Sequence, residues 1–213
     1  EDGELTAVVD EIRKLGRRSL AMQVDITRKA DVEHFVQEVV DQFGVIDILV
    51  NNAAVKRGGL LVELPEEDWD IVIDTDLKGT WLCSQAVAKR MIEQKNGTII
   101  NMSSIAGLWS LPSRNGAYNM AKAGVILLTK VLARNFGRYN IRVNAIAPGM
   151  VEEPLSESLW SDAHYRQMTE RMIPLGNRLG QMSDIIGPAL FLASEASVWV
   201  SGHTLIVDGG MVC

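Results

Sequence analysis

The stretch TIINMSSIAGLWSLPSRNGAYNMAKAGVILLTKVLAR, residues 98–134, decides the fold of this chain. It opens with an apolar, β-branched run, residues 98–102, which predicts a buried parallel strand that stops at Ser103 and Ser104. A loop rich in glycine, proline, serine and asparagine follows, and a helix is expected to begin near Ala117. The strand therefore delivers Ser104 to the carboxyl end of a sheet, the edge at which ligands bind in open α/β folds.

The helix that follows carries Tyr118 and Lys122, four residues apart and hence on one face. A phenol with a pKa of about 10 is a poor acid–base group at neutral pH, and a nearby cation lowers that pKa. If Ser104 donates a hydrogen bond to the oxygen that Tyr118 protonates, the trio suits proton transfer coupled to hydride transfer. The spacing Tyr-x-x-x-Lys is weak by itself, so a packed tyrosine beside a solvated lysine stays open as the alternative.

Composition limits the classes of function. The chain has 213 residues, 47% hydrophobic and 23% charged, which is ordinary for a globular protein with a sizeable core. A net charge of −6 argues against a nucleic-acid partner, and no apolar run reaches membrane-spanning length. The acidic residues 1–4 are unlike a signal peptide.

Cysteines and histidines point to a reducing, cytoplasmic setting without a metal. Cys83 and Cys213 indicate no disulfide framework. The histidines His34, His164 and His203 are scattered and do not have metal-ligand spacing, so no metal site is expected.

Strand-like and helix-like patterns alternate along the chain. Helices are expected at residues 4–15, 31–43, 66–93, 117–136, 154–172 and 184–193, and strands at residues 19–24, 46–50, 98–102, 141–147 and 204–207. Ser183 is the expected N-cap of the helix at 184–193. This alternation predicts an α/β fold with a parallel sheet covered on both faces. No linker, repeat or low-complexity tract interrupts it, so residues 1–213 are interpreted as one domain.

Several motifs, taken in order, resemble the short-chain dehydrogenases/reductases over essentially the whole chain. They are Asp25 after a strand, Asn-Asn-Ala-Ala at 51–54, the Ser104 strand, Tyr118-x-x-x-Lys122, Asn-Ala-Ile-Ala-Pro-Gly at 144–149 and Gly-His-Thr-Leu-Ile-Val-Asp-Gly-Gly at 202–210. The resemblance implies a Rossmann-type, doubly wound, mainly parallel sheet, NAD or NADP as cofactor, and a dimer or tetramer associating through residues 66–93 and 117–136.

Carried over by position, the resemblance gives Tyr118 the role of general acid/base. Lys122 would hold the nicotinamide ribose and lower the pKa of Tyr118, and Ser104 would polarise the substrate oxygen. Residues 150–182 would form a substrate-binding flap. Cofactor contacts are implied for Asp25, Ile26, Asn52, Ala53, Tyr118, Lys122, Pro148, Gly149 and Val151.

The sequence departs from the family at three places. The glycine-rich turn that binds pyrophosphate is not found, so we expect the sequence to lack a first strand–helix–strand unit of roughly 30 residues or more, which includes the residue that selects NAD or NADP. Asp76 stands where the family usually has a catalytic asparagine; its charge would weaken the pull of Lys122 on Tyr118 and move the activity optimum to higher pH. Glu153 replaces a frequent threonine and either repels phosphate or turns into solvent.

The function implied is an NAD(P)-dependent oxidoreductase that interconverts a secondary alcohol and a ketone. The substrate is open between a 3-oxoacyl thioester and a sugar or polyol. Apolar residues favour the first, and acidic ones argue against a strongly anionic substrate; they are Trp109, Leu155, Leu159, Trp160, Met168 and Met172, and Glu152, Glu153 and Glu157. The alternative is a non-catalytic binding or scaffold member, or a truncated fragment.

Overall fold

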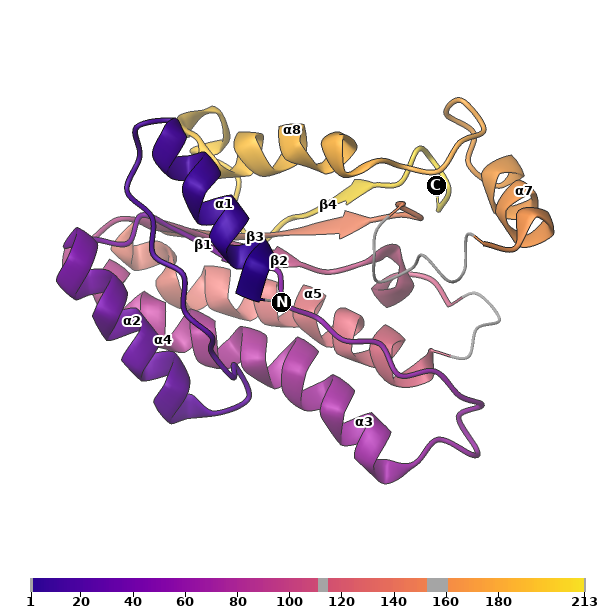
Figure 1. The fold of residues 1–213 in the computed structure, drawn as a ribbon, viewed down its shortest axis with the longest axis horizontal. Helices are drawn as coiled ribbons and strands as arrows, with labels where there is room; N and C mark the ends of the chain where they lie inside the picture. The colour runs from indigo at the N-terminus through magenta and orange to yellow at the C-terminus, as the bar shows by residue number, and fades with distance from the viewer. Residues whose placement is uncertain (1, 111–114, 153–160, 213) are drawn as a thin grey trace.

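A computed structural model describes residues 2–110, 115–152 and 161–212. In these residues one parallel sheet has the order β1-β2-β3-β4, and helices lie on both of its faces (Figure 1). The strands are β1 (Ile48–Asn51), β2 (Gly97–Met102), β3 (Ile141–Pro148) and β4 (Thr204–Val207). The helices include α2 (Lys29–Phe43), α4 (Thr80–Gln94) and α5 (Gly116–Phe136) below the sheet in that view and α8 (Met182–Ala193) above it, and α1 (Asp2–Lys14) crosses in front of the sheet.

Neighbouring residues of β2 show that both faces of the sheet are buried. Ile99 is 0% exposed and packs in a cluster with α2 and α4, which includes Val36 and Met91. Ile100 is 1% exposed and packs on the other face against Leu192 of α8. Successive strand residues point to opposite faces, so a run with no polar alternation requires this two-sided cover. The predicted α/β sheet with helices on both faces is confirmed.

A chain of polar side chains crosses the middle of the core. Asn51 and Asn101 lie directly opposite one another on β1 and β2. The Asn51 Nδ2 donates to Asn101 Oδ1 at 2.8 Å and to Ser84 Oγ at 2.9 Å, and Asn101 Nδ2 donates to Thr129 Oγ1 at 2.9 Å. The half-buried Asn51 and the buried Asn101 therefore both find partners on the helices and the adjacent strand.

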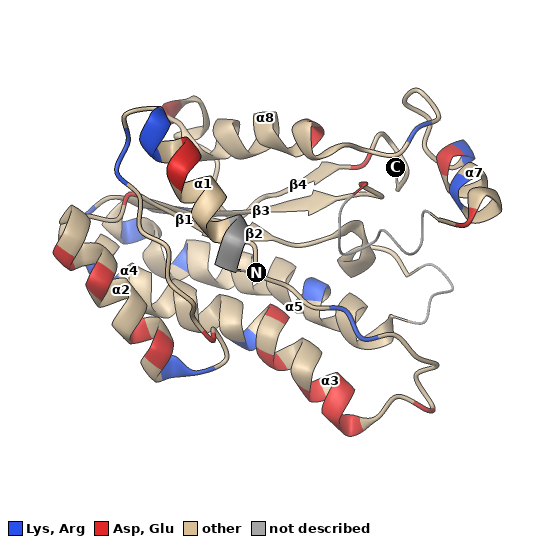
Figure 2. Cartoon of the chain, viewed as in Figure 1, with Lys and Arg blue, Asp and Glu red and all other residues tan. Residues whose placement is uncertain are grey.

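The long helix predicted at 66–93 contains an irregular turn. α3 (Glu66–Val72) passes into a π-helical segment, η1 (Ile73–Gly79), before α4 begins. Asp76 and Gly79 of η1 are buried. Single π-turns inside helices are frequent at functional sites, and this one directs Asp76 inward. Acidic side chains gather on α3, whereas lysines and arginines are spread over several elements (Figure 2).

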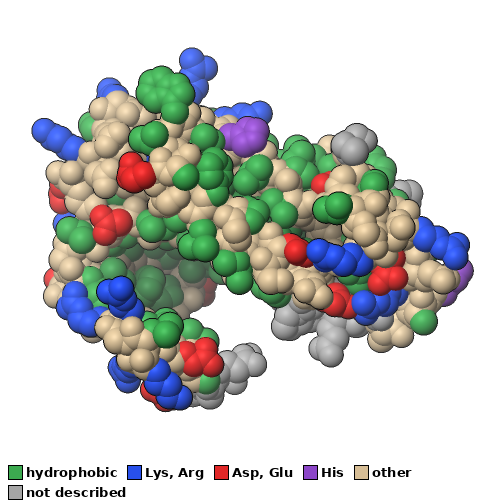
Figure 3. Space-filling view, turned by 90° about the horizontal axis from the view of Figure 1, so that it is seen from above, with side chains coloured by type: hydrophobic (Ala, Val, Ile, Leu, Met, Phe, Trp, Pro, Cys, Tyr) green, Lys and Arg blue, Asp and Glu red, His purple; other side chains and the backbone are tan. Residues whose placement is uncertain are grey.

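The strand predicted at 19–24 is wrong, because these residues pair with no strand in the described part of the chain. β1 is consequently an edge of the sheet, and Ile48 and Val50 are 46% and 48% exposed. A strand needs a hydrogen-bonded neighbour, which a pattern of apolar residues cannot supply. A cavity of about 240 Å³ lies here, bordered by Met22, Val24 and Val50 among others. Seen from above, a hollow separates α1 from the rest of the molecule (Figure 3).

Two further boundaries differ from the sequence expectation. α8 begins at Met182, and its N-cap is Gln181 instead of Ser183, because Gln181 and Asp184 satisfy each other's backbone N–H groups in a capping box. Of the helix predicted at 154–172, the described part is α7 (Ala163–Arg171), capped by Asp162; residues 153–160 lie outside the described residues. Among the described helices, none is long and apolar enough to cross a membrane.

Candidate active site

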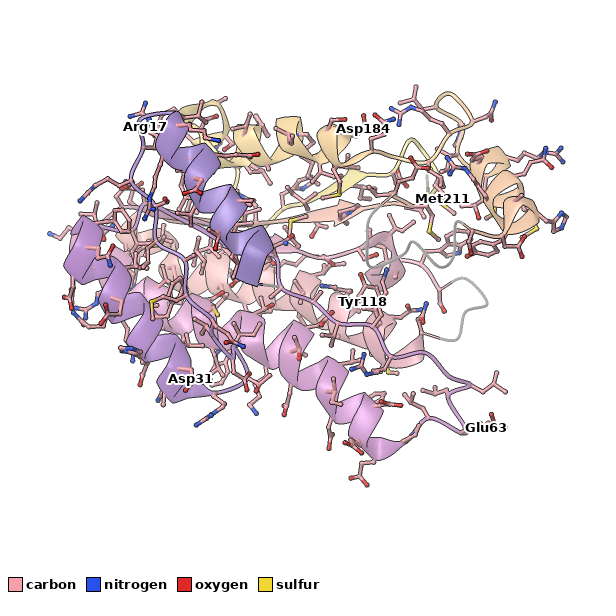
Figure 4. All side chains as sticks on the ribbon, viewed as in Figure 1. Arg17, Asp31, Glu63, Tyr118, Asp184 and Met211 are labelled. Carbon is pink, nitrogen blue, oxygen red and sulfur yellow. The ribbon has the colours of Figure 1, made fainter. Side chains whose placement is uncertain are left out.

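The candidate active site lies where β2 ends and α5 begins (Figure 4). Ser104 follows β2 in extended conformation and caps the short 3-10 turn η2 (Ile105–Gly107), its Oγ accepting the Ala106 N–H at 3.1 Å. α5 begins at Gly116, so Tyr118 lies in its first turn and Lys122 one turn further on. The predicted strand and helix are therefore present with the predicted side chains on them, and residues 111–114 of the expected loop lie outside the described residues.

Three contacts lock the end of β2 onto α5. Ser103 Oγ donates to the Lys122 carbonyl oxygen at 2.9 Å, and Lys122 Nζ donates to the Met102 carbonyl oxygen at 3.0 Å. A Cβ at Gly107 would lie 2.6 Å from the backbone nitrogen of Ala123, so only glycine lets η2 approach the helix this closely. In the sequence Ser103 is recognisable only as the end of a strand, whereas in the fold its hydroxyl fixes the helix that carries Tyr118.

Lys122 and Asp76 form a buried ion pair. Their Nζ and Oδ2 atoms are 3.3 Å apart, and the side chains are 3% and 0% exposed. Asp76 Oδ1 also accepts the Val55 N–H at 2.8 Å, which ties the segment after β1 to η1. Burial raises the pKa of Asp76 above its ordinary value, and the positive charge of Lys122 opposes that rise. Asp76 is thus in direct contact with the lysine.

Two ammonium groups face the ring of Tyr118. Lys122 Nζ is 5.4 Å from the ring centroid and Lys56 Nζ is 5.3 Å from it. The ring is partly buried beside Ala117, Ala121 and neighbouring apolar side chains. The sequence gives little indication of Lys56, because its one local signal is a basic residue shortly after the polar strand end at Asn51.

The residues implied for the cofactor are spread along the carboxyl edge. Asn52 and Ala53 are exposed after β1, and Pro148 and Gly149 are half-buried at the end of β3. Val151 is buried and pairs with Gly180.

The adenine contact was expected from Asp25 and Ile26. Asp25 is exposed, and hydrogen bonds from the hydroxyl and N–H of Thr27 lower its pKa. The Ile26 side chain packs against the core, which leaves its backbone for a ligand. The amide, phenol and ammonium donors of Asn52, Tyr118 and Lys122 suit the hydroxyls of a ribose, so the residues present fit the nicotinamide half of NAD(P).

The flap is described only in part. Glu153, Leu155, Glu157, Leu159 and Trp160 lie outside the described residues. Trp109, Met168 and Met172 are exposed apolar side chains. Glu152 forms an ion pair with Arg166, which also binds Glu170 at 2.9 Å, so the negative charge of Glu152 is neutralised locally.

A Rossmann-type sheet whose carboxyl edge carries a tyrosine and a lysine on one helix defines a class of NAD(P)-dependent oxidoreductases. The family model described as enoyl-(acyl carrier protein) reductase matches residues 1–212. The chain therefore belongs to the short-chain dehydrogenase/reductase family.

Relatives of known name differ in substrate. The 3-oxoacyl-[acyl-carrier-protein] reductase FabG of Staphylococcus epidermidis is 43% identical over 205 residues, 96% of this chain and 82% of the relative. The (2S)-[(R)-hydroxy(phenyl)methyl]succinyl-CoA dehydrogenase subunit BbsD of Thauera aromatica is 42% identical over 207 residues, 97% of this chain and 82% of its own length. A gluconate 5-dehydrogenase from Burkholderia cenocepacia, solved with NADP and tartrate, is 34% identical with a TM-score of 0.94, covering 99% of this chain and 82% of that one.

Proposed function

We propose that this protein interconverts a secondary alcohol and a ketone with NAD(P), and that Tyr118 is the general acid/base. The observation that carries the proposal is the Lys122 ammonium, buried 5.4 Å from the Tyr118 ring and tied to the strand end that precedes Ser104. Such a cation stabilises a phenolate and so brings the pKa of the phenol toward the working pH. NAD(P), when bound, donates or accepts the hydride.

Each side chain has a defined task in this proposal. During reduction the Tyr118 hydroxyl gives its proton to the carbonyl oxygen, and during oxidation its phenolate takes the proton of the alcohol. Ser104 Oγ already accepts the Ala106 N–H, so its own hydrogen can be donated to the same substrate oxygen. Lys122 binds ribose hydroxyls and stabilises the phenolate. Asn52 and Ala53 line the cofactor cleft, and Pro148, Gly149 and Val151 border the nicotinamide end.

For the substrate, we propose a small molecule with a ketone beside an apolar chain, such as a 3-oxoacyl thioester. The 43% identical relative named for that activity and the exposed apolar Trp109, Met168 and Met172 support it. A sugar acid or polyol is the second candidate, supported by the similarity to a gluconate 5-dehydrogenase. The ratio of kcat/KM for acetoacetyl-CoA and for a keto-sugar acid, measured with NADH and with NADPH, separates the two.

The proposed role of Tyr118 is tested by Tyr118→Phe in the whole protein as expressed. We expect kcat to fall by about 10²–10⁴-fold while the far-UV circular dichroism and NAD(P)H binding are retained, because only the proton carrier is removed. Tyr139→Phe is the matched control, since Tyr139 lies past the other end of α5 and its hydroxyl accepts from Arg138 at 2.7 Å. Unchanged turnover in Tyr118→Phe contradicts the proposal and favours a binding or scaffold protein.

We further propose self-association through α4 and α5. Both helices present exposed apolar side chains, namely Trp81, Met120, Leu127 and Val131. Exposed apolar area of this kind marks an interaction surface. Light scattering after size exclusion should give a dimer or tetramer, and a strictly monomeric mass refutes this part.

A further inference from the structure

The second cation at the Tyr118 ring, Lys56, has no role in the function proposed above. It lies in the segment after β1, which is anchored when the neighbouring Val55 N–H donates to Asp76 Oδ1 at 2.8 Å. That anchor brings a half-buried ammonium to 5.3 Å from the ring centroid, as close as Lys122. The loop therefore presents Lys56 to the phenol through the same carboxylate that binds Lys122.

The charges around the phenol explain why a second cation matters. Asp76 and Lys122 are buried 3.3 Å apart, so the negative charge of Asp76 offsets part of the effect of Lys122 on the phenol. With these two groups alone, ionising Tyr118 would leave the cluster with a net charge of about −1 in a poorly solvated place, which is costly. With Lys56 added, the cluster of Asp76, Lys122, Lys56 and the phenolate is neutral.

We propose that Lys56 acts through Tyr118 as a positioning residue, compensating the negative charge of Asp76 so that the phenolate can form. The inference rests on the proposed function of Tyr118 as the proton carrier. Among the described residues, the charged groups at the ring are Lys122 on α5 and Lys56 on the loop, and Asp76 on η1 binds Lys122. α3 packs in the same apolar cluster and carries Glu66, Glu67, Asp68 and Asp70, of which Asp68 pairs with Arg57 of the loop at 3.6 Å. The remaining charges of η1, Asp74 and Lys78, are about half exposed and pair with each other at 3.1 Å.

A direct titration of the phenol tests this without substrate. The chain has three tyrosines, so ¹³Cζ-labelled tyrosine gives three signals, and Tyr118→Phe identifies the one that belongs to Tyr118. Lys56→Met should raise the pKa of Tyr118 by about 0.5–1 unit, and Lys56→Arg should restore the parent value because it restores the charge. Lys78→Met is the matched control: it removes the same charge from a side chain that pairs with Asp74 at the surface, and it should leave the Tyr118 signal unmoved.

The compensation itself is tested by a double variant. Asp76→Asn should lower the pKa of Tyr118, and Lys56→Met combined with Asp76→Asn should return it to within about 0.3 unit of the parent value. The pH dependence of alcohol oxidation should move in parallel. A Lys56→Met protein whose Tyr118 titrates as in the parent overturns the inference even where Tyr118→Phe has abolished turnover. Retained turnover in Tyr118→Phe instead overturns the proposed function. In that case the titration still shows whether Lys56 lowers the pKa of Tyr118.

Discussion

Two regions of the molecule place an aspartate beside a cation, and the pKa of the aspartate shifts in opposite directions in the two. In the candidate active site, Asp76 lies 3.3 Å from Lys122, with both side chains nearly inaccessible at 0% and 3%. At the start of α8, Asp184 lies 2.7 Å from Arg178, and these side chains are 36% and 49% exposed. The pKa of Asp76 is raised, whereas that of Asp184 is lowered to about 2.

Solvation explains the difference. Loss of water is the largest influence on Asp76 and outweighs the charge of Lys122. Asp184 keeps its water and gains hydrogen bonds from Arg178 and from the Gln181 N–H, all of which favour the charged form. A short distance to a cation therefore does not by itself define a stabilising pair. The buried pair of Asp76 and Lys122 costs desolvation energy, which is typical of a functional site. The exposed pair of Asp184 and Arg178 lies at the N-terminus of α8, where Asp184 takes part in the capping box.

The largest effect should come from removing the buried anion outright. Asp76→Leu leaves the buried Lys122 ammonium without its counter-charge and the Val55 N–H without its acceptor, so we expect the free energy of unfolding to fall by about 3–5 kcal/mol in urea titrations. Asp74→Leu is the comparison, because the Asp74 side chain is about half exposed and pairs with Lys78 at the surface. This change should lower the free energy of unfolding only slightly. A loss below about 1 kcal/mol for Asp76→Leu would show that the buried pair is solvated after all.

A milder change at the same position should alter the chemistry. Asp76→Asn keeps an acceptor for Val55 but removes the negative charge, so Lys122 and Lys56 act on Tyr118 with less opposition. The rising limb of the pH–rate profile for alcohol oxidation should move down by about 0.5–1 pH unit. A profile identical to that of the parent contradicts the idea that Asp76 sets the optimum.

The smallest effect is expected at the surface pair. The folded-state pKa of Asp184, about 2, is below the ordinary value of 3.8, so its stabilisation is present above 3.8 and is lost as the pH falls toward 2. Asp184→Asn should therefore lower the melting temperature slightly at neutral pH, and the difference from the parent should shrink in that acid window. If the difference stays constant through the window, the carboxylate charge is not what stabilises α8.

Local patterns were enough to predict much of the fold and part of the site. The unbroken apolar run at β2 predicted a sheet covered on both faces, and the spacing of Tyr118 and Lys122 predicted a shared helical face. Local patterns do not show which distant segments come into contact in the fold. The pattern at 19–24 could not reveal that no strand pairs with it in the described chain, and nothing local predicted that Lys56 would approach the Tyr118 ring.

The paired asparagines of β1 and β2 bear on how the chain finds its fold. Asn51 and Asn101 meet only when the two strands align as observed. A slip of β1 by one residue would turn Asn51 to the opposite face and leave the buried Asn101 Oδ1 without its donor. The polar pair therefore favours the observed alignment of β1 and β2 over an alignment that is displaced by one residue.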